Sequence, residues 1–140
     1  MKLILSIILL LSVGICNQIE AQYQRVAVST FKKVPNDFTG CGDSYYLSER
    51  DKKQGEFVCI TNYVFALMYV DNKEIRFKAN EKISHNKNEQ IYVSGKYKLS
   101  LKRTYIRNVG DEDYVFKGII TVKLDDRLVY QKQIIGEGGC

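Results

Sequence analysis

The 140-residue sequence lacks several residues that common active sites require. It contains no tryptophan and one histidine, and its four cysteines form no C-x-x-C pair. The histidine, His85, lies in the polar stretch SHNKNE, where we expect a solvated loop residue rather than a catalytic base held on a rigid element. Zinc needs Cys and His ligands at a recognisable spacing, which Cys41, Cys59, His85 and Cys140 do not offer. The sequence therefore predicts no metal and no cofactor.

Long apolar runs are also absent. No segment approaches the roughly 20 apolar residues of a membrane-spanning helix, so we expect no transmembrane segment. The longest apolar run, 3–11, follows Lys2 and precedes the small residue Ala21, which is the layout of a secretory signal peptide cut after Ala21. This layout predicts a secreted or periplasmic protein, with residues 1–21 removed and residues 22–140 forming one β-rich domain.

Cys16 offers an alternative to simple export. Lipoproteins are cut directly before a cysteine that then carries lipid, and Cys16 lies close to the apolar run. Ile15 is bulky where such sites carry a small residue, so an outer-membrane lipoprotein is the less favoured prediction.

Alternation of apolar and polar residues dominates the rest of the chain. Tyr97, Leu99 and Leu101 alternate with polar residues, mostly lysines, in the segment 96–103, and 73–79 alternates in the same way. Such a pattern is typical of antiparallel strands with one buried face. We expect further strands at 23–29, 44–47, 56–61, 63–70, 90–94, 113–124 and 127–135. The predicted fold is all-β: a single-domain antiparallel β-sandwich or small barrel of about eight strands with little helix.

Short polar segments predict the connections between these strands. Asp71-Asn72 and Asp125-Asp126 each separate two strand candidates, and Asp and Asn tolerate the positive φ of tight hairpin turns. We expect longer loops at 80–90 and 107–113. The segment 47–55 predicts one helical turn with Ser48 as its cap and Gly55 as its end. Glycines near the C-terminus are expected to let the chain leave the sheet after residue 135.

Three cysteines remain after removal of residues 1–21, and export would place them in an oxidising compartment. Cys41 and Cys140 both lie among glycines, which allow the close backbone approach that a disulfide needs. Cys59 lies in the apolar stretch EFVCITNY and is expected to be a buried free thiol. We therefore predict a Cys41–Cys140 disulfide.

Positive charge is spread along the sequence, which has a formal net charge of +5 at pH 7. Dispersed lysines at alternating positions indicate a solvated sheet face, and they favour anionic partners such as cell-wall polymers or an acidic protein. We expect no nucleic-acid binding, because an exported protein rarely meets any. The basic residues in question are Lys32, Lys33, Lys52, Lys53, Lys96, Lys98, Lys102, Arg103, Lys117 and Lys123.

Two acidic clusters in the sequence are candidates for a catalytic site. Glu49, Asp51 and Glu56 form one, and 111–113 forms the other. Hydrolysis of a glycosidic bond needs two carboxylates that face each other across a cleft, whereas both clusters lie at predicted turns. A small hydrolase with an unrecognised carboxylate site is therefore an alternative function, and we expect no catalytic residue.

Three segments, TGCGDSYYLSERDKKQGEFV, ALMYVDNKEIRFK and YVFKGIITVKLDDRLVYQKQIIGEGGC, cover most of residues 22–140. In their order along the chain they resemble small exported proteins of Gram-negative bacteria. That group carries no function that could be transferred to this chain.

The stretches FVCITN, ALMYVDNKEIRFK and YVSGKY also resemble the c-type lysozyme inhibitors, which are exported single-domain β-barrels. In that family a loop serine and a nearby lysine reach into the acidic active-site cleft of lysozyme. The resemblance carries these roles to Ser94 and Lys96, and Tyr92 in the same stretch is a further candidate for partner binding. The cysteine positions differ from the family pattern, and the loop before Ser94 is longer.

The sequence thus favours a non-catalytic binding or structural module over an enzyme, because no nucleophile, base and orienting group converge in it. A lysozyme-type inhibitor and a small hydrolase are the alternatives. The expected partner is an unknown protein or a cell-envelope component, and we expect a monomer. A binding module predicts a surface that carries lysines and tyrosines, whereas a hydrolase predicts a pocket with converging acids near Glu49 and Asp51.

Overall fold

Nine strands and two short helices make up most of the part of the chain that the structure, a computed structural model, describes: residues 25–80 and 88–140. The predicted signal peptide, Cys16 and His85 lie outside these residues. A 3-10 turn covers Asn36–Phe38 (η2) and an α-helix covers Glu49–Gln54 (α1). The strands are β1 Val28–Ser29, β2 Gly42–Tyr46, β3 Cys59–Thr61, β4 Phe65–Val70, β5 Lys73–Ala79, β6 Glu89–Ser94, β7 Tyr97–Asn108, β8 Tyr114–Leu124 and β9 Arg127–Gly139.

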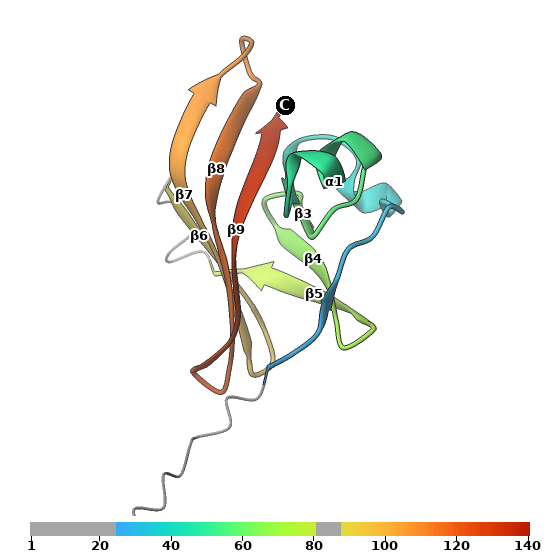
Figure 1. The fold of residues 1–140 in the computed structure, drawn as a ribbon, viewed down its shortest axis with the longest axis vertical. Coiled ribbons are helices and arrows are strands. Elements are labelled where there is room, and N and C mark those ends of the chain that lie inside the picture. Colours follow the sequence, from blue (N-terminus) through green and yellow to red (C-terminus); the bar gives the residue numbers. More distant parts are fainter. Residues whose placement is uncertain (1–24, 81–87) are drawn as a thin grey trace, which may run out of the picture.

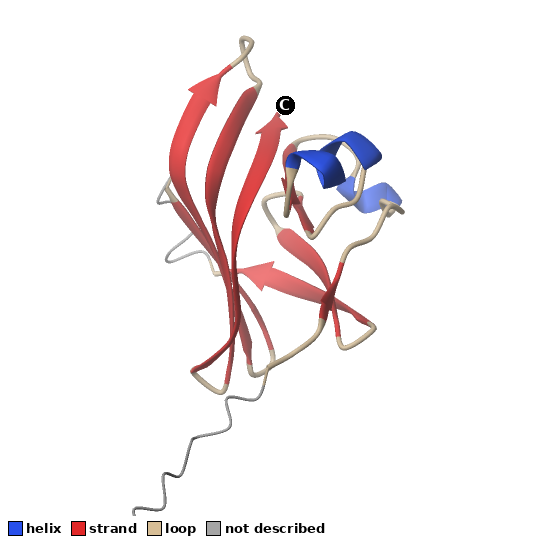
Figure 2. Ribbon diagram, viewed as in Figure 1, coloured by secondary structure: helices blue, strands red, loops and turns tan. Residues whose placement is uncertain are grey.

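Strands β2 to β9 form one closed antiparallel barrel. Each strand pairs with the next in the sequence, and β9 pairs with β2 to complete the ring of eight. The short strand β1 adds to the barrel at β4. Figures 1 and 2 show the long β7, β8 and β9 on one side, with α1 beside the end of β9. The predicted all-β class is confirmed, and of its two architectures the barrel is the one formed.

Alternating side chains from β7 and β8 fill the barrel interior. Leu99 lies opposite Val122 and Leu101 lies opposite Ile120, and all four side chains are fully buried. Burial of each such side chain contributes roughly 1.5–3 kcal/mol. An eight-stranded barrel encloses a space that side chains can fill, so the alternation in the sequence becomes a packed core.

Both predicted hairpin turns are confirmed. Asp71 and Asn72 have φ of 50° and 61°, and Asp125 and Asp126 have φ of 50° and 62°. Positive φ at both central residues matches the right-handed twist of the flanking strands. These turns connect β4 to β5 and β8 to β9.

The predicted helical turn is confirmed as α1. The Ser48 side chain accepts a hydrogen bond of 3.1 Å from the backbone N–H of Asp51, and Gly55 ends the helix in the left-handed conformation with φ of 64°. A serine cap satisfies one N–H that a helix of this length otherwise leaves unpaired.

The predicted end of the last strand is wrong. We expected the strand to finish at 135 and the glycines to lead the chain off the sheet, but β9 continues to Gly139. A Cβ on Gly136 would lie 2.3 Å from the ring of Phe116, and a Cβ on Gly138 would lie 1.9 Å from Oδ1 of Asp43. The glycines are therefore needed inside the strand, where neighbouring side chains leave no room for a Cβ.

Strand β7 also extends further than expected. Its predicted end lay at 103, whereas the strand runs to Asn108 through an irregularity between Arg103 and Tyr105. The hairpin loop that follows is correspondingly shorter than the predicted 107–113. Of the strand expected at 23–29, the structure describes 25–29, and β1 covers 28–29 of these residues.

The predicted disulfide is confirmed. Cys41 and Cys140 are bonded, with Cα atoms 4.3 Å apart, and join positions 99 residues apart in the sequence. Cys59 is a buried free thiol, as expected, and burial raises its pKa. A disulfide fits an oxidising compartment. Within residues 25–80 and 88–140, no helix has the length and apolar character needed to cross a bilayer.

Candidate functional site

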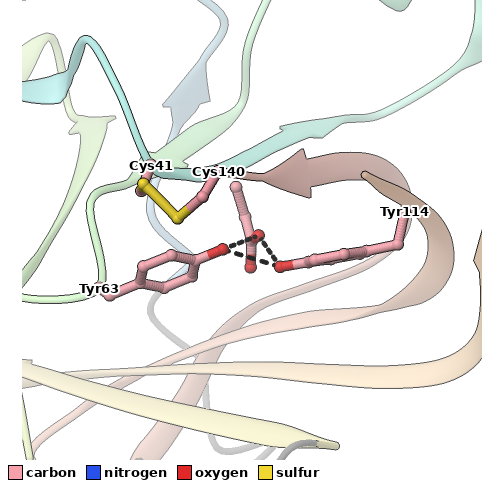
Figure 3. The surroundings of a disulfide bond; sticks show 5 residues. Cys41, Tyr63, Tyr114 and Cys140 are labelled. Carbon is pink, nitrogen blue, oxygen red and sulfur yellow. Dashed lines mark hydrogen bonds between the residues drawn. A yellow bond between two sulfur atoms is a disulfide. The ribbon is translucent and has the colours of Figure 1, made fainter. Parts of the chain in front are cut away.

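The end of the barrel that carries the disulfide also carries a buried carboxylate, Asp43. Figure 3 shows the hydroxyl groups of Tyr63 and Tyr114 meeting beside the bond between Cys41 and Cys140. These hydroxyl oxygens are 2.8 Å apart, and each also contacts Oδ1 of Asp43. The Asp43 side chain is fully inaccessible to solvent.

The Asp43 carboxylate accepts hydrogen bonds from several side chains. Its Oδ2 accepts from Nη2 of Arg103, from the Tyr45 hydroxyl at 3.2 Å and, at 3.5 Å, from the Gln90 amide. Its Oδ1 accepts from Tyr63 at 3.1 Å and from Tyr114. A carboxylate offers about four lone-pair positions. We call this set of six side chains the Asp43 network: Asp43, Tyr45, Tyr63, Gln90, Arg103 and Tyr114.

Arg103 places the positive charge of this network inside the barrel. Its side chain is 8% exposed, and its guanidinium carbon lies 5.1 Å from the ring centre of Tyr114 and 5.0 Å from that of Phe116. Burial opposes its charge, but the Asp43 carboxylate together with Tyr45 and Tyr114 outweighs that effect, so the pKa of Arg103 is raised. The guanidinium therefore stays charged and paired.

Burial also keeps the tyrosines of the network protonated. Burial raises the pKa of Tyr45 and of Tyr114, and the nearby Asp43 carboxylate raises both further. Each phenol consequently remains a hydrogen-bond donor. A general base needs a lone pair within reach of a substrate proton, whereas the Asp43 oxygens already accept five side-chain hydrogen bonds. This arrangement joins β2, β6, β7 and β8, which is a structural role.

The sequence interpretation missed the Asp43 network. A signal for one member was present: the inward alternation of Tyr97, Leu99 and Leu101 continues to Arg103. No comparable pattern points to Asp43, which lies 60 residues away in the sequence. Only strand pairing brings the two side chains together.

The outer face of β7 and β8 carries an array of lysines. Because Leu99, Leu101, Ile120 and Val122 point inward, the residues that alternate with them point outward. We define the lysine face as the outward residues Lys98, Lys102, Lys117 and Lys123, with Tyr105 and Arg107 at its upper end.

The lysine face carries net positive charge within the part of the chain that the structure describes, with the carboxylate Glu89 opposite Lys102 in the pairing of β6 with β7. Lys98 lies directly opposite Lys123 in the pairing of β7 with β8, and like charges in this position destabilise a sheet. None of the four lysines forms a salt bridge with another described residue. Ser100 and Thr121, which lie opposite each other between the lysines, add hydroxyl groups to the face.

Two of the predicted partner-binding residues lie at a turn. Ser94 ends β6, and Lys96 follows Gly95 in the tight connection to β7. Gly95 has φ of 56°, and the exposed Lys96 ammonium lies 4.0 Å from Oδ1 of Asp125. This turn is at the barrel end opposite the disulfide.

The third predicted partner-binding residue, Tyr92, lies inside the barrel. Its side chain is buried, and its hydroxyl donates a 2.8 Å hydrogen bond to Gln90 Oε1. Alternation along β6 explains this, because Tyr92 pairs with the buried Leu99. The side chain is part of the core and is not presented to a partner, so this expectation is corrected.

The acids that are candidates for catalysis lie on three segments: Glu49 and Asp51 in the first turn of α1, Glu56 shortly after this helix, and 111–113 in the β7–β8 hairpin. Glu49 lines a shallow groove of about 320 Å³ together with Lys52, Arg107 and Lys117. Glu56 pairs with Lys32 at 3.6 Å. The acidic stretch 111–113 is exposed at the tip of the β7–β8 hairpin. The groove therefore combines one carboxylate with three cations, which differs from the facing pair of acids that a glycosidase needs.

Comparison of the chain with protein-family models, with curated proteins and with solved structures found no match.

Proposed function

We propose that the protein is a non-catalytic binding module whose lysine face holds an anionic polysaccharide of the cell envelope. The observation that carries this proposal is the group of four outward lysines without salt-bridge partners among the described residues. An anionic polymer laid across Lys98 and Lys123 would offset the repulsion between them. The hydroxyl and amide groups of Ser100, Thr121 and Gln131 provide hydrogen-bonding partners for sugar groups on the same face.

The lysine face is open and runs across neighbouring strands, and such a surface suits a polymer better than a small molecule. The hollow over this face has a volume of about 550 Å³, and its lining comes from the exposed surface of four neighbouring strands. Small-molecule sites are usually concave and enclose most of their ligand. Electrostatic attraction at exposed lysines also weakens as salt rises, because the Debye length falls to about 8 Å at physiological ionic strength.

Binding of the purified protein to an immobilised acidic polysaccharide tests this proposal. We expect retention on alginate and on dextran sulfate, elution by salt, and no retention on neutral dextran. A variant with glutamine at Lys98, Lys102, Lys117 and Lys123 should bind at least about tenfold more weakly at low salt.

The matched control carries glutamine at four exposed lysines elsewhere, Lys32, Lys33, Lys53 and Lys73, and has the same net charge as the test variant. Equal losses in the two variants would show that net charge alone drives retention and would refute a defined face. If the purified protein binds an immobilised acidic protein but neither polysaccharide, the proposed class of ligand is refuted.

The turn between β6 and β7 supports a second candidate function, inhibition of a lysozyme. The resemblance to c-type lysozyme inhibitors assigns partner contacts to Ser94 and Lys96, and both residues lie at the projecting turn, with Lys96 largely exposed. Addition of the protein to lysozyme at equimolar ratio and at tenfold excess tests this candidate. Slower lysis that is relieved by Lys96→Ala, but not by the control Lys73→Ala, would support it, whereas unchanged lysis would reject it.

A further inference from the structure

Among the described residues, the outer half of β7 has a strand on one side only. β6 pairs with Tyr97–Lys102, and the last contact on that side is the 2.7 Å hydrogen bond from the Arg103 N–H to the Asn88 carbonyl. Beyond it, Thr104 lies at the irregularity of β7, 105–108 pairs with β8, and no described strand lies along the other edge of this segment. Figure 1 shows β7 and β8 rising together beyond β6. We call 104–108 the β7 edge.

The side chains of the β7 edge are unusually exposed for apolar residues in a strand. Tyr105 is 55% exposed and Ile106 is 39% exposed. Unpaired strand edges are templates for another strand, and proteins commonly protect them with lysine or proline. The β7 edge contains neither residue.

The backbone of Ile106 faces the open side of this strand. Across the hairpin, the Val109 N–H donates to the Asp113 carbonyl at 2.9 Å. Hydrogen-bonding directions alternate along an antiparallel strand, so the backbone groups of Arg107 point toward β8 and those of Ile106 and Asn108 point away from it. The open edge thus offers donors and acceptors centred on Ile106.

We propose that two copies of this chain pair their β7 edges in antiparallel orientation, with the twofold axis at Ile106. In this register Ile106 faces the same residue of the second copy, and Tyr105 faces Arg107 in both directions. Isoleucine pairs are favourable across strands, and a guanidinium on a tyrosine ring contributes about 0.5–1 kcal/mol at exposed sites. The segment 105–107 is therefore complementary to itself.

The geometry of the β7 edge limits this dimer to a short ladder. Asn88 occupies the position beside Arg103, and Thr104 lies at the irregularity of β7, which leaves 105–108 as regularly paired strand. A ladder this short buries less than the roughly 1,200–2,000 Å² of stable interfaces. The dimer is accordingly weak, in contrast with the monomer that the sequence led us to expect.

Pairing about this axis also brings the two lysine faces onto the same side of one continuous sheet. Because like charges then approach each other, added salt should strengthen the dimer by screening. Salt should weaken retention on an acidic polysaccharide, so the two proposals predict opposite salt dependence. The dimer does not rest on the proposed function, and each can fail alone.

Two substitutions at Tyr105 test the register by sedimentation velocity at protein concentrations from about 10 µM to 1 mM. Tyr105→Glu would place a carboxylate opposite Arg107 twice and should tighten the dimer at least about threefold. Tyr105→Lys would place like charges there and should leave only monomer. The proposal would be overturned if both the parent protein and the Tyr105→Glu variant stay monomeric at 1 mM. It would also be overturned if the two substitutions change dimerisation equally.

Cysteine cross-linking tests the position of the twofold axis. Residues directly opposite in a hydrogen-bonded antiparallel pair have Cα atoms about 5.5 Å apart, within disulfide range. Ile106→Cys should therefore form a disulfide-linked dimer under mild oxidation. The control Asn108→Cys should not, because its two copies would lie about four residues, or roughly 14 Å, apart along the ladder. Equal cross-linking of the two variants, with circular dichroism confirming that both are folded, would overturn the register.

Discussion

Two arginine–aspartate pairs in this protein share the same chemistry and differ in environment. Arg103 and Asp43 lie inside the barrel, with side chains 8% and 0% exposed. Arg76 and Asp37 lie on the surface, with side chains 42% and 49% exposed and an Nη1–Oδ2 distance of 2.5 Å. Both join segments that are distant in the sequence, so sequence separation does not distinguish them.

Burial determines what each pair contributes. Surface ion pairs contribute little, because water and salt screen the attraction and two long side chains lose freedom. A buried pair owes its attraction to the same low-dielectric interior that makes each isolated charge costly. The Asp43 carboxylate therefore needs its tyrosine and glutamine donors as well as Arg103, whereas Asp37 can exchange Arg76 for water.

Loss of the buried carboxylate should have the largest effect. Asp43→Asn leaves the Arg103 guanidinium buried without a counter-charge, and we expect the free energy of unfolding to fall by about 3–5 kcal/mol in urea denaturation. The double variant Asp43→Leu/Arg103→Met removes both charges and should be less destabilised than Asp43→Asn. If Asp43→Asn lowers the free energy of unfolding by no more than Asp37→Asn does, then burial does not distinguish the two pairs.

Ionisation of the buried tyrosines should have an intermediate effect, at high pH. The folded state holds the protons of Tyr45 and Tyr114 because their pKa values are raised above the ordinary value of 10.0. Their contribution to stability is therefore complete below about pH 10 and is lost as the pH rises further, by about 1.4 kcal/mol per pH unit for each group.

Unfolding in urea at several pH values from about 9 to 11 measures this loss. Tyr45→Phe removes one of the titrating groups and should flatten the decline above pH 10, whereas Tyr105→Phe, at an exposed position, should leave it as in the parent. If the free energy of unfolding declines with equal slope above pH 10 in the parent and in both variants, the network tyrosines do not cause the decline.

Loss of the surface pair should have the smallest effect. The hydrogen bond from Arg76 lowers the pKa of Asp37 below its ordinary value of 3.8. Any stabilisation is therefore present above that value and disappears as the pH falls through the lowered pKa. At pH 7 we expect Asp37→Asn to unfold at the same urea concentration as the parent within error, and raised salt to leave this result unchanged. A clear loss of stability would show that the exposed pair acts like the buried one.

Local features of the fold could be predicted from the sequence because their causes are local. The strand 73–79 appears as β5 with the predicted bounds, since apolar and polar residues alternate throughout it. The turns at Asp71-Asn72 and Asp125-Asp126 follow from residues that accept positive φ. The Cys41–Cys140 bond could be predicted because only these two cysteines lie among glycines.

Features that depend on distant neighbours were missed. The glycines 136 and 138 resembled a flexible tail, yet they lie in β9 because Phe116 and Asp43 occupy the space of their Cβ atoms. Tyr92 was a candidate for partner binding because it lies in the stretch YVSGKY with Ser94 and Lys96, yet β6 directs it into the core. The sequence around glycines 136 and 138 and around Tyr92 does not identify the residues that surround them in the folded protein.

The approximate positions of the strands, the turns between them, one capped helix and the residues able to form the disulfide follow from the amino-acid sequence alone. These features depend on the two-residue period of strands, on backbone dihedral preferences and on chain composition. Three other features arise from the folded arrangement of the strands: the closure of the barrel, the contact of Asp43 with Arg103, and the common face of the lysines of β7 and β8. Closure of the barrel pairs β9 with β2, and that pairing brings residues that are far apart in the sequence into contact.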